Sequence, residues 1–154
     1  MTAIAQPVTG QDINLAARAT RQVLEVLLAE QGTSFTPFAA LNQIVVLGPS
    51  VDRDGLVRRL GSAFALDDAS VPAILHGLQA RGLVHQTTSS GAAASAQVEL
   101  TAAGEDEHQR LTRLVAGLTA ELYRGFDADD LATTRRVLVA VTERATAQIR
   151  SSIC

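Results

Sequence analysis

The sequence has too little cysteine and histidine to be held together by disulfides or a metal ion. Its single cysteine, Cys154, is the last residue, so no disulfide framework is available. The three histidines lie far apart, and no pair has the spacing of metal ligands, so we expect no metal and no cofactor. A chain of 154 residues needs neither, because a domain of this size buries roughly two thirds of its unfolded surface.

Lysine is also absent, and aromatic residues make up only 3% of the chain. All 13 basic residues are arginine, and the chain has 16 acidic residues, which gives a formal net charge of −3. This balance provides no general attraction to nucleic acid, so any contact with DNA must come from a local patch. The scarcity of aromatic side chains argues against stacking on single-stranded bases.

No apolar run approaches the roughly 20 residues of a membrane span. The first residues have neither the basic start nor the apolar core of a signal peptide. Hydrophobic residues make up 47% of the chain, enough for a packed core. We therefore expect one cytoplasmic domain without a membrane partner. No nucleophilic triad, phosphate-binding loop or spaced carboxylate pair is recognisable, so an enzyme interpretation has no defined chemistry.

The spacing of apolar residues predicts a mainly helical chain. A first helix is expected over about residues 11–31, with Thr9 and Asp12 forming a capping box at its start. The next helix, up to Leu47, is apolar almost all round and is therefore expected to be buried and central. A third helix is predicted near residues 52–64. A fourth is predicted over residues 70–81, with Ser70 as its N-cap.

The second half of the chain predicts a hairpin and two long helices. Residues 83–86 and 98–100 have the composition of short strands that pair as a loose β-hairpin. Thr101 is expected to cap a long helix, which Gly125 ends, and Asp127 to cap a last helix.

This order of elements resembles the MarR family of dimeric bacterial regulators, which have a winged helix-turn-helix. Residues 59–66 resemble the family's first helix of that motif, residues 70–84 its recognition helix with the following glycine stop, and residues 98–104 the last wing strand and the next helix cap. The resemblance implies a mainly α (α+β) fold. The winged helix would cover about residues 35–100, and dimerisation helices about 11–31 and 102–150.

The first and last helices carry more apolar surface than a small winged helix can cover. The resemblance implies that this surface forms a homodimer, and intramolecular packing is the alternative. The residues expected to face inward are Leu24, Leu114, Leu118, Leu138, Val141 and Ile149.

The resemblance also implies that the fourth helix lies in the major groove of double-stranded DNA. Arg58, Arg59 and Arg81 would contact phosphates, while His76 or Gln79 lies near bases. The full set of candidate DNA-binding residues is Arg53, Arg58, Arg59, Ser70, Ala73, His76, Gly77, Gln79 and Arg81.

The same region departs from the family in three ways. Between Arg53 and Glu99, four arginines face four acidic residues, so the module is neutral, whereas DNA affinity depends on neutralising phosphates. Alanine and glycine occupy much of the recognition face and cannot form bidentate contacts with bases. The wing tip, TTSSGAAASAQ, lacks the Asp and Arg pair that similar proteins usually have.

Relatives bind small, often aromatic, effectors in the cleft between the dimer helices and the winged helix. The residues expected to line such a cleft are Arg21, Phe38, Leu41, Asn42 and His76. Two functions remain open. One is a MarR-like DNA-binding regulator that responds to a small aromatic effector. The other is a MarR-like scaffold that has lost DNA binding and uses the cleft as a small-molecule-binding protein or enzyme.

Overall fold

The computed structural model describes residues 7–64, 66–67, 69–88 and 96–153, so Cys154 and most of the wing tip lie outside the described residues. The described elements are α1 (Gly10–Glu30), α2 (Phe35–Leu47), β1 (Val51–Asp52), α3 (Arg53–Phe64), α4 (Ser70–Ala80), β2 (Val84–Thr88), β3 (Ala96–Leu100), α5 (Ala102–Leu122) and α6 (Ala128–Ile153). They divide into one compact unit up to Leu118 and a second from Thr119 onward. None of the described helices is long and apolar enough to cross a membrane.

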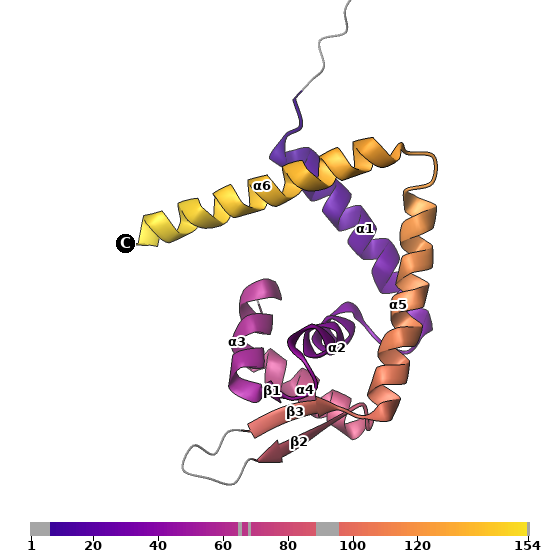
Figure 1. Ribbon diagram of the computed structural model, residues 1–154, viewed down its shortest axis with the longest axis vertical. Helices are drawn as coiled ribbons and strands as arrows, with labels where there is room; N and C mark the ends of the chain where they lie inside the picture. The colour runs from indigo at the N-terminus through magenta and orange to yellow at the C-terminus, as the bar shows by residue number, and fades with distance from the viewer. Residues whose placement is uncertain (1–6, 65, 68, 89–95, 154) are drawn as a thin grey trace, which may run out of the picture. The chain divides into compact units, whose positions relative to one another are not determined.

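The first unit contains a winged helix-turn-helix, which confirms the predicted fold class (Figure 1). Its sheet has the order β1-β3-β2, and both pairings are antiparallel. The hairpin register places Val84 opposite Leu100. On the other side of β3, Val98 pairs with Val51 of β1. Strand β1 was not predicted, because two residues are too few to show an alternating pattern.

The core of this unit lies where α2, α3 and α4 meet the sheet. The prediction that α2 is central is confirmed, but the prediction that it is buried all round is wrong. One face packs inward through Ala40, Leu41 and Ile44, whereas Val46 remains 65% exposed. The fully buried large side chains of the unit are Leu28, Leu41, Ile44, Leu56, Leu60, Leu75, Leu78, Leu111, Val71, Val84 and Val98.

The predicted capping box of α1 is confirmed. The Thr9 hydroxyl accepts a hydrogen bond from the backbone N–H of Asp12 at 3.3 Å, and the Asp12 carboxylate accepts one from the backbone N–H of Thr9 at 2.8 Å. The hydrogen bonds from Thr9 lower the pKa of the Asp12 carboxyl. At the start of α6, the Asp127 carboxylate accepts from the backbone N–H of Asp129 at 2.8 Å, as predicted.

Thr101 caps α5 and also joins it to the turn that follows α4. Its hydroxyl accepts a hydrogen bond from the N–H of Gly104 at 3.0 Å and donates one to the carbonyl of Gly82 at 2.6 Å. The backbone N–H of Thr101 donates to the carbonyl of Leu83 at 3.1 Å. The first turn of α5 is therefore fixed directly against the residues that connect α4 to β2.

The second unit consists of the last turn of α5, a turn at Gly125 with φ of +87°, and α6. No residue of α6 is buried among those whose exposure is described. Its apolar side chains Val137, Leu138, Val139, Val141 and Ile149 are between 40% and 61% exposed. A helix with this many exposed apolar side chains needs a covering surface, because helical propensity alone gives little stability in water.

We expect Gly104→Ala to destabilise the protein, because a Cβ atom there would lie 1.9 Å from the carbonyl oxygen of Leu83. Overpacking against backbone lowers the free energy of unfolding by about 3 kcal/mol. Gly117→Ala in the same helix is the matched control: no atom outside its own helix lies within 4 Å of its Cβ position. There alanine should stabilise by roughly 0.5–1 kcal/mol. Urea unfolding at one fixed protein concentration measures both, and equal effects would contradict the close approach.

Candidate DNA-binding face and ligand groove

Helix α4 is fixed at its start by an aspartate rather than by the predicted serine. The Asp67 carboxylate accepts hydrogen bonds from the backbone N–H groups of Ser70 at 2.7 Å and Ala69 at 3.1 Å. The prediction that Ser70 is the N-cap is therefore wrong: Ala69 occupies that position without a side-chain cap, and Asp67 supplies the capping oxygen. Hydrogen bonds from Ser70 lower the pKa of the Asp67 carboxyl.

Helix α4 buries one side and leaves the other side exposed. Val71, Leu75 and Leu78 are buried in the core, as predicted. The candidate base-contacting residues Ala73, His76, Gly77 and Gln79 are exposed, and Ser70 is half-buried. An exposed helix face of this kind fits the major groove of DNA. Only His76 and Gln79 offer polar side chains among the four exposed residues.

One side-chain contact connects this face to the wing, and a second holds the two strands of the wing hairpin together. The Gln86 amide on β2 donates a hydrogen bond to the Gln79 side-chain oxygen at 2.8 Å. Within the hairpin, His85 and Glu99 face each other in register, with Nε2 and a carboxylate oxygen 2.9 Å apart. Gln79 is therefore held against β2 rather than free to rotate.

Three of the four candidate arginines already have partners within the protein. Arg53 lies 3.5 Å from the Asp54 carboxylate. The Arg59 Nε donates to Gln43 of α2 at 3.0 Å. Arg81, at the end of α4, lies 3.5 Å from the carboxylate of Glu107 on α5.

Arg58 differs from these three, because it is exposed and forms no ion pair within the described part of the chain. Of the four candidate arginines, Arg58 is the one most available to an external anion.

Glu107 holds two arginines at once. Besides Arg81, it pairs with Arg110 at 2.9 Å, and this hydrogen bond raises the pKa of the Arg110 guanidinium. Arg110 also donates to the side chain of Gln31, directly after α1. The Glu107 side chain is only 16% exposed, so these contacts connect the end of α4 to α5 and to the end of α1.

A groove of 670 Å³ lies in the first unit, beside the end of α2. Residues from α2, the connection to β1, strand β3 and the first turns of α5 form its walls. The lining residues are Val45, Gly48, Pro49, Glu99, Leu100, Glu105, His108 and Gln109.

His108 is the best-fixed polar group of this groove. Its Nε2 lies 3.2 Å from the Asn42 side-chain oxygen. Its ring stacks on Phe38, with 6.5 Å between centroids and 17° between planes. Burial lowers the pKa of the His108 imidazole, so the ring is neutral at neutral pH.

The structure does not bring the five predicted cleft residues together. Phe38 and Asn42 meet through His108, but Leu41 is only 2% exposed in the hydrophobic core. Arg21 is paired with Glu25 at 3.0 Å, and its guanidinium lies 3.4 Å above the ring of Phe35. His76 lies on the exposed face of α4.

Sequence reasoning missed Glu99, Glu105 and His108 as residues of one groove. Glu105, His108 and Gln109 are spaced as neighbours on one helix face, and this spacing was the available signal. The contact between Asn42 and His108 spans 66 residues, which no local pattern can reveal. Within the described residues, no group of three or more histidine, cysteine or acidic side chains could hold a metal ion.

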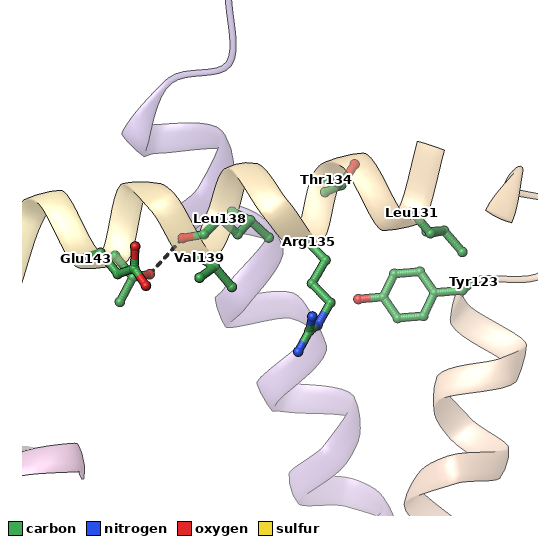
Figure 2. A pocket seen from close by; sticks show the side chains of 8 residues that line it. Tyr123, Leu131, Thr134, Arg135, Leu138, Val139 and Glu143 are labelled. Carbon is green, nitrogen blue, oxygen red and sulfur yellow. Dashed lines mark hydrogen bonds between the residues drawn. The ribbon is translucent and has the colours of Figure 1, made fainter. Parts of the chain in front are cut away.

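Apolar side chains from the second unit gather in a separate groove of 540 Å³ on α6. Figure 2 shows Leu131, Leu138 and Val139 along α6, with the ring of Tyr123 beside Leu131 and its hydroxyl end toward Arg135.

No family profile matches the sequence, and no curated protein matches it either. Solved structures of MarR-family regulators share its fold. A point mutant of MarR from E. coli is 20% identical, with a TM-score of 0.72 over 89% of this chain and 98% of that chain. The E. coli mutant in complex with operator DNA is 21% identical, with a TM-score of 0.70 over 86% and 91%.

An organohalide-sensing transcriptional regulator in its 2,4-dichlorophenol-bound form is a further match. It is 13% identical, with a TM-score of 0.71 over 94% of this chain and 89% of that chain. At these identities the comparisons establish the fold, which is that of MarR-family regulators.

We expect His108 to make the protein less stable as the pH falls below the ordinary histidine pKa of about 6.5. Because the pKa of His108 is lowered in the folded state, the unfolded chain takes up its proton first and is favoured as the pH falls toward the folded pKa. Denaturant unfolding at pH 7.5 and 5.5 should show a smaller loss for His108→Gln than for the unchanged protein. An equal loss in both would contradict this role.

Proposed function

We propose that this chain is a MarR-type transcriptional regulator, a cytoplasmic homodimer that binds double-stranded DNA and responds to a small molecule. The observation that carries the proposal is the exposed outer face of α4 in a winged helix, a fold shared with a MarR structure solved on operator DNA. The dichlorophenol-bound relative supports a small aromatic effector.

In this proposal α4 lies in the major groove and the arginines contact the backbone. His76 and Gln79 are the side chains that reach bases, and Gln86 keeps Gln79 in place. The small residues Ser70, Ala73 and Gly77 complete the surface and allow α4 to approach the bases closely. Arg58 makes the main phosphate contact, because Arg53, Arg59 and Arg81 must share their guanidinium groups with internal partners.

The exposed apolar side of α6 supports the homodimer. Leu138, Val141 and Ile149 are 40%, 45% and 61% exposed, so α6 presents an apolar face that one chain does not cover. On α1 and α5, the predicted interface residues Leu24, Leu114 and Leu118 are half-buried. A two-fold symmetric contact is the commonest way to close such a surface.

The second candidate function is a scaffold without DNA binding, which binds a small molecule or acts as an enzyme. The engaged arginines and the neutral winged helix favour it, because affinity for DNA comes mostly from phosphate neutralisation. On this alternative, ligand binds but DNA does not.

Binding to DNA should be weak and salt-sensitive, with a shallow salt slope. Arg58, Arg59 and Arg81 contribute about three phosphate contacts per protomer, so a dimer should show a slope of about −5 in log affinity against log salt. Arg58→Ala should reduce that slope by about 2 and weaken all DNA sequences alike. Fluorescence anisotropy at several salt concentrations, with DNA from upstream of the protein's own gene, measures both.

Arg113→Ala, which removes an exposed arginine of α5, is the control for a general loss of charge. If it lowers the slope as much as Arg58→Ala, the interface is misplaced. If no binding is seen even at low salt, the result favours the second candidate function.

The homodimer predicts that Val141→Glu shifts the protein toward monomer, because a carboxylate would replace an apolar contact. Sedimentation velocity at micromolar concentration should show a dimer for the unchanged protein and a larger monomer fraction for the variant. Gln148→Glu adds the same charge to an exposed polar position of α6 and should leave the dimer intact. A stable monomer without any substitution would exclude the homodimer.

A further inference from the structure

The groove between the end of α2, β3 and the start of α5 carries a charge pattern that points to one class of ligand. Its volume of 670 Å³ falls within the roughly 300–1,000 Å³ of small-molecule sites. None of the eight described residues that line it is an arginine and the only base is His108, whereas Glu99 and Glu105 are carboxylates. An anionic ligand would meet repulsion here, and a cation would meet attraction.

His108 adds a hydrogen-bond acceptor to these two carboxylates. His108 Nε2 lies 3.2 Å from the Asn42 side-chain oxygen and 3.4 Å from the Thr112 hydroxyl, and in the tautomer that donates to Asn42 the proton of the neutral ring is on Nε2. Nδ1 is then unprotonated and offers a lone pair. The ionisable groups of the groove are therefore all hydrogen-bond acceptors, and a matching ligand must be a donor.

The remaining walls are suited to an apolar body. Val45, Pro49 and Leu100 line the groove from three different segments. Glu99 already has a partner, because one of its carboxylate oxygens lies 2.9 Å from Nε2 of His85. Glu105, by contrast, is exposed in the first turn of α5 and forms no ion pair within the described residues.

We propose that this groove binds a small amphipathic organic cation, with its apolar body against Val45, Pro49 and Leu100 and its ammonium group beside Glu105 and Glu99. The inference rests on the proposed response to a small molecule and names the charge of the ligand. Arg21, which was expected to line the cleft, is not a residue of this groove and is engaged with Glu25 and Phe35.

Three ligands with the same body and different end groups test the charge preference. We would use 4-phenylbutylamine, 4-phenylbutanol and 4-phenylbutyrate in isothermal titration calorimetry with the full chain at pH 7.5, without DNA. The amine should bind at least tenfold more tightly than the carboxylate, with the alcohol in between. Equal binding of all three, no binding of the amine, or preference for the carboxylate would overturn the inference.

Matched variants then test the site. Glu105→Gln should weaken binding of the amine about three- to tenfold and leave binding of the alcohol unchanged. Asp106→Asn removes the same charge from the next residue of α5, which does not line the groove, and should leave amine binding unchanged. An equal loss in both variants would show attraction to overall negative charge and would overturn the site. Since these titrations contain no DNA, their failure leaves the DNA-binding test of the proposed function untouched.

Discussion

The arrangement of the winged helix depends on one close approach between the start of α5 and the turn after α4. Only a glycine fits at position 104, because the carbonyl of Leu83 occupies the place of its Cβ. Two hydrogen bonds from Thr101, to Gly82 and Leu83, hold the same junction. Helix α4, the wing hairpin and α5 therefore meet at one fixed junction. The groove beside His108 lies along β3 and the first turns of α5, which both end or begin at this junction.

Local patterns in the sequence predicted the parts of the fold that local forces determine. Helical periodicity placed the six helices, and Thr9, Thr101 and Asp127 cap as expected. The errors fall where an element is very short or where the contact that decides it comes from outside the element. Strand β1 is defined only by its pairing with β3, and Asp67 caps α4 from outside the helix.

The candidate sites were harder to predict than the fold, because they depend on which side chains find partners. Counting charges showed a neutral winged helix, but it could not show that Arg59 is held by Gln43 or that Arg21 lies over Phe35. The groove is formed by segments that only the tertiary structure brings together. Its acidic character was thus hidden in residues that, read singly, resemble ordinary surface positions.

The sharing of Glu107 between two arginines has a consequence for communication within the first unit. An anion that draws Arg81 away leaves the full negative charge of Glu107 to Arg110. Arg110 reaches both of its partners at once, because its Nε and Nη2 donate to Glu107 while its Nη1 donates to Gln31. A change of partner at the tip of α4 therefore alters the charge around the guanidinium that joins α5 to the end of α1, without any need for a helix to move.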